Sequence, residues 1–405
     1  MRFQNGKDDV CFILSWFSGA FSRPSFKLFS SFIVGFIQLG KEAHTSSMVK
    51  SLSISFLEKS LSCFTHFLGK NPWEVDEVMD VAVRRFFKTL RIQARSPLFI
   101  ILDDTIQEKT GKKIPGCAWY KDHARNMANV FGHQWVVAAL LWKNTLMPLW
   151  ARLYHSRKNK GCGRFQTKIT MAQKLIKDLR LPVTCKLYLL TDGWYWAKEL
   201  VKVCREYGYH MISQLKSNSV IEVKGKRIRV TELDSCSKAY RQISISLYGK
   251  NKNLNIAKWI ATIKGIGPIA IVVVKEKGKK TRYLVSTNLY LPALEVVKYY
   301  ARRWKIEQMI KDLKQRLGFG DYQVRNLPAI HRHIAIAFLS YFVLTMLKIF
   351  QSLKDNHFAP ELSIRSLAAI VRRNILVENI TITLKTMRVH FKQNILDSYL
   401  EQLNA

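Results

Sequence analysis

Residues 99–105 read Phe-Ile-Ile-Leu-Asp-Asp-Thr, an apolar run that ends on two carboxylates. Four apolar residues are too few for a buried helix, whereas the central strand of an α/β sheet is covered on both faces and is continuously hydrophobic. A second run of this kind, residues 187–190, leads into Asp192. The two runs therefore predict two central strands, each with an aspartate at its carboxyl end.

The segments around these runs predict the rest of a mixed α/β sheet. Further strands are expected at 135–142 and 146–154, and an amphipathic helix at 168–179. Strands first, then a helix, then a strand is the order of a mixed sheet. If the two central strands are parallel neighbours, Asp104 and Asp192 emerge at one edge of the sheet, where ligand sites of α/β folds form.

The regions outside this core have a different pattern. Residues 213–290 contain short β-type runs punctuated by Gly and Lys, which predicts an antiparallel β insertion. Residues 1–95, and almost all residues after 292, carry helical periodicity. We therefore expect an N-terminal helical region (1–95), an α/β core in two parts (96–212 and 291–330), the β insertion (213–290) and a C-terminal helical region (331–405).

The balance of charged residues indicates a polyanionic partner. The chain has 405 residues, with 65 Lys and Arg against 29 Asp and Glu, and a formal net charge of +36. Such an excess destabilises a compact protein by self-repulsion and favours binding to nucleic acid or to an anionic membrane. Hydrophobic residues make up 48% and aromatic residues 12%, which excludes a disordered basic tail.

Three other classes of protein are disfavoured. Uncharged stretches such as 126–142 are shorter or more polar than the about 20 apolar residues that cross a bilayer, so we expect no membrane partner. The seven cysteines form no CxxC pair, which argues against a disulfide framework and a zinc site and fits a reducing cytosol. No GxxxxGK[ST] loop is present, so ATP-driven action is not expected.

Two short amphipathic pieces in the N-terminal region, one near 54–60 and one that ends at Gly69, allow a helix-turn-helix. A small helical bundle with no base-reading role fits them equally well, because the motif has no sharp sequence signature. In either arrangement we expect the region 1–95 to bind DNA.

The last helix of the predicted core carries Tyr300, Arg303, Glu307 and Lys314. At about 100° per residue these side chains lie within an arc of roughly 60°, and Lys311 falls close beside them. One face of that helix would thus be cationic with a single carboxylate. A solvated face with ordinary ion pairs is the alternative interpretation of this helix taken alone.

Three carboxylates, Asp104, Asp192 and Glu307, would converge at the edge of such a sheet and could hold divalent metal ions. Magnesium and manganese prefer hard oxygen ligands, and a pair of such ions stabilises both the attacking and the leaving oxygen of phosphoryl transfer. Either aspartate alone is more typical of a helix cap or a turn. The combination with a cationic helix in a strongly basic protein favours the metal site.

The sequence resembles the transposases of the IS4 group of bacterial insertion sequences. The residues Tyr300, Arg303, Glu307 and Lys314 match the family's Y-(2)-R-(3)-E-(6)-K signature. Residues 102–105, Leu-Asp-Asp-Thr, resemble its first catalytic strand, and residues 190–193, Leu-Thr-Asp-Gly, its second. The long interval that follows resembles the family's β insertion, and the resemblance covers about residues 97–330.

This resemblance implies an RNase H-like core of the DDE type, in which Asp104, Asp192 and Glu307 bind two Mg²⁺ ions, with Mn²⁺ as a substitute. The enzyme would cut double-stranded DNA at the terminal inverted repeats of its element and join the freed 3′ hydroxyls to target DNA. Asp104 is preferred to Asp103 as the ligand because the family's aspartate directly precedes a threonine. Only one of the two can serve, since neighbouring strand residues point to opposite faces.

The resemblance also implies partners and contacts. The residues Tyr300, Arg303, Lys311 and Lys314 would grip DNA phosphates beside the cut, for which a guanidinium fork, an ammonium and a hydroxyl are suited. Two element ends must be held together, so a homodimer on DNA is expected, in the cytoplasm of a prokaryote and associated with the nucleoid.

One further family feature is an aromatic side chain of the insertion that stacks on an unstacked base. Tyr283 and Trp259 are the candidates here, and core packing is the alternative for each. Two alternatives to the whole function stay open: a metal-dependent nuclease or resolvase on the same core, and a catalytically inactive DNA-binding protein whose acids are structural.

Overall fold

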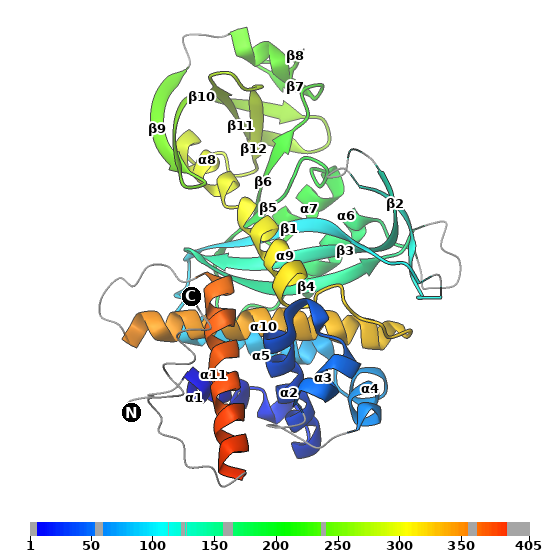
Figure 1. Cartoon of the computed structure of the whole chain (residues 1–405). Coiled ribbons are helices and arrows are strands. Elements are labelled where there is room, and N and C mark those ends of the chain that lie inside the picture. The colour runs from blue at the N-terminus through cyan, green and yellow to red at the C-terminus, as the bar shows by residue number, and fades with distance from the viewer. Residues whose placement is uncertain are drawn as a thin grey trace. The chain divides into compact units, whose positions relative to one another are not determined.

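The computed structural model describes residues 6–52, 60–111, 113–122, 126, 128–156, 165–235, 240–354 and 363–386 (Figure 1). The chain divides into two compact units. One is made by both ends of the chain, residues 1–81 and 312–405, and the other by residues 82–311. Every strand in the described part of the chain belongs to the second unit, which also contains Asp103, Asp104, Asp192 and Glu307.

The core of the second unit is a five-stranded mixed sheet in the order β4-β3-β1-β5-β6. Strand β3 is antiparallel to β1 and β4, whereas β1, β5 and β6 are mutually parallel. This is the strand order of an RNase H-like fold, so the predicted mixed α/β class is confirmed. The strands are β1 (Pro97–Glu108), β3 (Ala128–Trp142), β4 (Thr145–Tyr154), β5 (Lys186–Leu190) and β6 (His210–Leu215).

The central strands form where the apolar runs predicted them, and they extend further. Leu98 to Leu102 of β1 and Leu187 to Leu190 of β5 are almost completely buried. Strand β1 continues through its polar half to Glu108, because that half pairs with residues 132–137 of β3. The two strands approach so closely that a Cβ on Gly132 would lie 2.1 Å from the carbonyl oxygen of Gln107. Hydrophobicity predicts only the buried half of such a strand.

Helices complete the core. The α6 helix (Lys168–Asp178) begins at Thr167, whose hydroxyl accepts a hydrogen bond from the Thr170 amide at 3.0 Å. The α7 helix (Lys198–Glu206) leads from β5 to β6, and the last part of α5 (Val75–Leu90) belongs to the same unit.

The predicted continuous helix after residue 292 is wrong in one respect, because it is two helices. The α8 helix covers Ala293–Ala301 and α9 covers Trp304–Arg316. Between them the amides of Arg302 and Arg303 bond three residues back, to the carbonyls of Tyr299 and Tyr300, which tightens the chain into a turn. Arg303 therefore lies in the turn, with Tyr300 before it in α8 and Glu307 after it in α9.

The β insertion continues the core sheet, because its last strand pairs antiparallel with β6; together with β2 (Ala118–Asp122), which pairs with β3, the sheet has 12 strands. Its strands are β7 (Val220–Val223), β8 (Lys226–Arg229), β9 (Arg241–Leu247), β10 (Lys250–Ile263), β11 (Gly267–Glu276) and β12 (Arg282–Ser286). Strand β10 was missed from the sequence because its Lys and Asn residues interrupt the apolar pattern. A short 3₁₀ helix, Val230–Ser235, follows β8.

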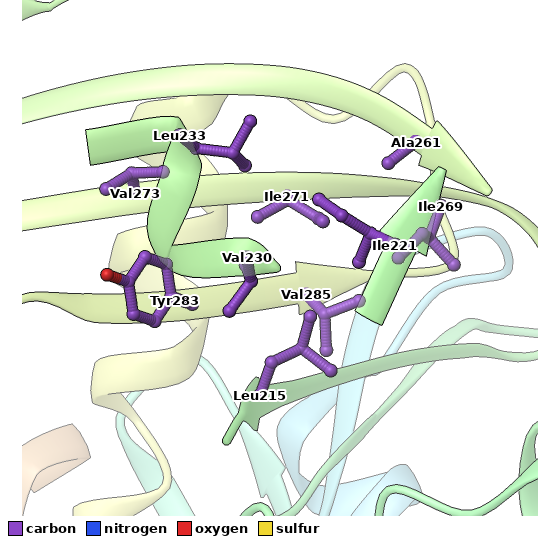
Figure 2. Packing of buried hydrophobic residues seen from close by; sticks show 10 residues of the cluster. All are labelled: Leu215, Ile221, Val230, Leu233, Ala261, Ile269, Ile271, Val273, Tyr283 and Val285. Atoms are coloured by element: carbon purple, nitrogen blue, oxygen red, sulfur yellow. The ribbon is translucent and has the colours of Figure 1, made fainter. Parts of the chain in front are cut away.

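Figure 2 shows the hydrophobic cluster that holds the insertion together, drawn from β6, β7, β10, β11, β12 and the 3₁₀ helix. Tyr283 lies in this cluster and donates a hydrogen bond to Asp234 Oδ2 at 2.8 Å, while Trp259 packs against it. Both candidates for base stacking therefore belong to the core of the insertion.

The helical unit has an aromatic core. Phe32 packs against Phe36, Phe64 and Phe67, with ring centroids 5.3 to 6.4 Å apart. Its helices are α1 (Gly6–Ser15), α2 (Arg23–Leu39), α3 (Thr45–Leu52), α4 (Leu61–Gly69), the start of α5, α10 (Leu327–Lys354) and α11 (Ile364–Thr386). The expected helix near 54–60 lies almost entirely outside the described residues.

The long α10 helix is apolar enough over residues 327–352 to cross a membrane, but 83% of its most apolar window is buried inside the protein. Its polar residues are bound within the unit. Arg332 is buried and donates hydrogen bonds to the carbonyls of Leu68 and Trp73, at 3.0 and 2.8 Å. The α10 helix is therefore built as a core helix.

Candidate active site

The four acidic residues of the site come from three elements of the strand-containing unit. Asp103 and Asp104 lie in β1, Asp192 follows β5, and Glu307 lies in the first turn of α9. The Asp192 carboxylate is oriented by its own turn, because its Oδ1 accepts hydrogen bonds from the amides of Trp194 (3.1 Å) and Tyr195 (3.4 Å). Since β1 and β5 are parallel neighbours, the aspartates emerge at the same edge, as predicted.

The two neighbouring aspartates of β1 have different hydrogen-bond partners. Arg303 donates from Nη1 to Asp103 Oδ2 at 3.1 Å and from Nη2 to Glu307 Oε1 at 2.5 Å. Phe99, which has the same strand parity as Asp103, packs its ring against Tyr299 of α8 at 4.7 Å. The face of β1 that carries Asp103 is thus the face covered by α8 and α9.

Asp104 faces the other way. Its Oδ2 accepts hydrogen bonds from Gln134 Nε2 of β3 and from Lys168 Nζ of α6, both at 2.6 Å. The Lys168 ammonium also lies over the rings of Trp194 and Tyr154, 5.1 and 5.5 Å from their centroids. The sequence predicted that Asp104 acts together with Glu307. The residue that shares a partner with Glu307 is instead Asp103, because neighbouring residues of a strand point to opposite faces.

Two aspartates of the acidic cluster have raised pKa values. The pKa of Asp103 is raised to about 7, with burial as the largest cause; Arg303 and the Asp104 amide lower it, and the charges of Asp104 and Asp192 raise it. The pKa of Asp192 is also raised, first by burial, and the Asp104 carboxylate contributes. Asp192 is therefore close to both faces of β1.

Tyr195 lies beneath this cluster. Its side chain is fully buried, and its hydroxyl has no hydrogen-bond partner within the described part of the chain. Burial, followed by the charges of Asp104, Asp103 and Asp192, raises the pKa of its phenol well above the ordinary value. The hydroxyl is thus within electrostatic reach of three carboxylates.

The structure brings two of the four predicted phosphate-binding residues to the acids. Tyr300 is buried, its hydroxyl donates to Gln214 Oε1 at 3.4 Å, and the Arg303 charge opposes the rise in its pKa caused by burial. Lys311 is exposed on α9, four residues after Glu307. Lys314 is further along the same helix, in the part of the chain that belongs to the helical unit.

Sequence reasoning missed several residues around the site. Lys168 lies in a basic segment of the sequence, where many Lys and Arg residues made it no more notable than its neighbours. Gln134 and Tyr195 belong to no sequence pattern that indicates a functional role. Trp304 and Tyr248 form an exposed aromatic pair beside the turn, with ring centroids 6.1 Å apart. The tryptophan that directly follows the signature arginine is the one feature of the sequence that could have drawn attention to this pair.

The residues fit a divalent metal ion in their chemistry, though not in their present spacing. Among the described residues, no group of three His, Cys, Asp or Glu side chains is close enough to hold a metal. The donors are hard carboxylate oxygens, which Mg²⁺ and Mn²⁺ prefer. A cation already joins two of them, because the Arg303 guanidinium lies between Asp103 and Glu307.

The sequence profile of the family described as "Transposase DDE domain" matches residues 96–343, more than half of the chain. The chain belongs to this family. It is 22% identical over 338 residues to the probable transposase for insertion sequence element IS701 of Microchaete diplosiphon, a match that covers 80% of this chain and 83% of the relative. The resemblance to an insertion-sequence DDE transposase is therefore confirmed.

A solved structure, the piggyBac transposase synaptic complex with hairpin DNA, is similar with a TM-score of 0.48 and 13% sequence identity. That similarity covers 97% of this chain and 82% of the piggyBac chain. The family assignment makes this chain an enzyme of DNA transposition. All four acidic residues and Arg303 lie inside the segment that matches the DDE profile.

Proposed function

We propose that this transposase cuts double-stranded DNA at the terminal inverted repeats of its own insertion sequence and joins the 3′ hydroxyls to target DNA. The observation that carries the proposal is the shared Arg303, which connects Asp103 of β1 with Glu307 of α9 across 200 residues of sequence. Two acids that face one another at the carboxyl edge of this sheet form the kind of site that phosphoryl transfer requires.

The proposed acidic set is Asp103, Asp192 and Glu307. Asp103 takes the place of Asp104 in this set because it lies on the face of Glu307, whereas Asp104 is engaged by Lys168 and Gln134. A divalent ion, Mg²⁺ or Mn²⁺, supplies charge stabilisation for the attacking and leaving oxygens of phosphoryl transfer when it is bound.

The remaining residues of the site hold the DNA. Arg303 offers a fork of two N–H donors to a phosphate, and Lys311 and Lys314 offer point charges along the same helix. Tyr300 supports Arg303 from α8. The exposed rings of Trp304 and Tyr248 provide an aromatic surface on which an unpaired base could stack, in place of the buried Tyr283 and the partly buried Trp259.

The proposal extends to partners and location. The net charge of +36 suits the long DNA that a transposase holds at both element ends, and two ends held together favour a homodimer. The N-terminal helices are proposed to contribute to DNA binding. We place the enzyme in the cytoplasm of a prokaryotic cell, associated with the nucleoid.

The test is Glu307→Gln in the full chain, with DNA that carries the sequences flanking the gene as substrate. We expect Mg²⁺-dependent cleavage to fall by at least about 1,000-fold, or roughly 4 kcal/mol of transition-state stabilisation, with DNA binding retained. The control is Glu295→Gln, which removes an acid of α8 that pairs with Lys298 at 3.0 Å. Unchanged cleavage by Glu307→Gln would refute the assignment.

The products separate this function from its alternatives. Joined DNA molecules identify a transposase, whereas nicks or breaks without joining identify a nuclease or resolvase on the same core. DNA affinity that is indifferent to all the carboxylates and to Mg²⁺, with no cleavage, identifies an inactive DNA-binding protein.

A further inference from the structure

Arg303 occupies an unusual position for a residue that is proposed to bind DNA. Its guanidinium is bonded within the site, with one arm on Asp103 and the other on Glu307. The Arg303 side chain is 18% exposed, so part of it is accessible from solvent. A phosphate that takes both terminal nitrogens of Arg303 as a fork therefore competes with these two carboxylates.

Arg303 and a divalent metal also compete for the same two carboxylates. A metal ion needs the oxygens of Asp103 and Glu307 turned onto one small ion at about 2 Å. A planar guanidinium bonded to both carboxylates keeps them apart and supplies the positive charge in the place of the ion.

The side chain of Arg303 can rotate while its backbone stays in the turn. The residue lies in the two-residue turn between α8 and α9 and not within either helix. Its own amide is bonded to the Tyr300 carbonyl, so the backbone of the turn is held, while rotation about the side-chain bonds can release the guanidinium from the two acids. The neighbours at the surface are Trp304, which is 46% exposed, and the cation Lys305, so a phosphate is attracted to this side of the turn.

We infer that Arg303 is the counter-ion of the metal site in the free enzyme, and that a DNA phosphate draws it out so that metal can enter. This inference rests on the proposed function and adds an order to it: DNA first, metal second. Because binding linkage is reciprocal, the metal also tightens DNA binding by the factor by which DNA tightens metal binding. An enzyme of this kind binds its metal more weakly until its substrate is in place.

Affinity for Mn²⁺ measures this coupling without any cleavage. The full-length protein is titrated with Mn²⁺ and followed by the loss of the free-ion EPR signal, with and without a short duplex oligonucleotide at low salt. For the unaltered protein we expect the duplex to tighten Mn²⁺ binding by roughly 5- to 150-fold, the usual range of coupling between two ligands. Arg303→Gln should bind Mn²⁺ more tightly without DNA, and most of the effect of the duplex should be lost.

Arg302→Gln is the matched control, because it removes the same charge one residue earlier. The Arg302 guanidinium lies over the rings of Phe99 and Tyr299 and donates to the Lys143 carbonyl. We expect Arg302→Gln to keep the effect of the duplex. Arg303→Lys keeps the charge without the fork and should fall between the other two, so it tests the inference even if Arg303→Gln is poorly folded by circular dichroism.

The outcomes distinguish this inference from the proposed function. An equal effect of the duplex in Arg303→Gln and Arg302→Gln, or tight Mn²⁺ binding by the unaltered protein without DNA, would overturn the inference alone. Mn²⁺ affinity that does not change in Glu307→Gln, with or without DNA, would overturn the proposed metal site and the inference with it.

Discussion

Asp103 and Asp104 are identical side chains on consecutive residues of β1, and the fold gives them different surroundings. On one face two acids, Asp103 and Glu307, share a single cation, Arg303. On the other face one acid, Asp104, has a cation, Lys168, and an amide, Gln134. The first face has more negative charge than its partners neutralise, whereas the second is closed by its own contacts.

This difference shows how a strand can support a reactive site and a structural one at adjacent positions. A metal ion is attracted to a face where acids outnumber cations, and it gains little where a carboxylate already has a lysine. Asp104 with Lys168 connects β1 to α6 and to the loop of Trp194, two residues beyond Asp192. The contacts of Asp104 thereby stabilise the edge of the sheet at which Asp103 and Glu307 lie.

The largest effect is expected when each aspartate is changed to asparagine in turn. Asp103→Asn should reduce metal-dependent cleavage by about 1,000-fold or more, since it removes an oxygen ligand on the face of Glu307. Asp104→Asn should keep cleavage within about tenfold of the unaltered enzyme, because the loss of a positioning contact costs less than the loss of a ligand. Both rates are measured on the same DNA, with thermal melting as the folding control. The reverse ranking would make Asp104 the ligand and refute the comparison.

A smaller effect on stability is expected from Lys168→Met. It leaves the Asp104 carboxylate, which is 25% exposed, without its cation, and we expect a loss of roughly 1–3 kcal/mol in the free energy of unfolding. Urea denaturation measures this loss, and the exposed Lys174→Met on α6 is the control. The double variant Asp104→Asn with Lys168→Met should recover most of it. Strictly additive losses would show that the two residues do not form a stabilising pair.

The smallest effect is expected from Tyr195→Phe, which removes a buried hydroxyl that lies near the carboxylates of both faces. Because that hydroxyl has no hydrogen-bond partner among the described residues, its removal should change the free energy of unfolding by less than about 1 kcal/mol, or stabilise the protein. Chemical denaturation checks this, and Tyr283→Phe, which loses the bond to Asp234, should be the more destabilised of the two. A clear loss in Tyr195→Phe would mean that the hydroxyl donates to one of the acids.

Most of the fold could be predicted from local patterns. The central strands were visible because burial on both faces makes them continuously apolar, and the insertion because its short β-type runs interrupt an α/β order. Strand β10 was missed because polar residues such as Lys252 and Asn253 alternate with its buried ones, and hydrophobicity sees only burial. The break between α8 and α9 was missed because neither Gly nor Pro marks it and the turn at Arg302 and Arg303 is made by backbone hydrogen bonds alone.

The candidate site also has a part that local features of the sequence predict and a part that they do not. Asp192 and Glu307 could be predicted because a strand end and the spacing of a signature are local features. The partners of Asp103 and Asp104 were not found, since Gln134, Lys168 and Arg303 lie 30, 64 and 200 residues away from the aspartates they contact.

By itself, the sequence determined that this protein is a basic α/β protein with an acidic residue at each of two strand ends and a third on a late helix. Those properties depend on composition, hydrophobic runs and residue spacing, which are all local. Only the tertiary structure decided that Asp103 faces Glu307, that Arg303 joins the two, and that Lys168 engages Asp104. The reason is geometric: successive residues of a strand point to opposite faces, and the elements that cover each face come from distant parts of the chain.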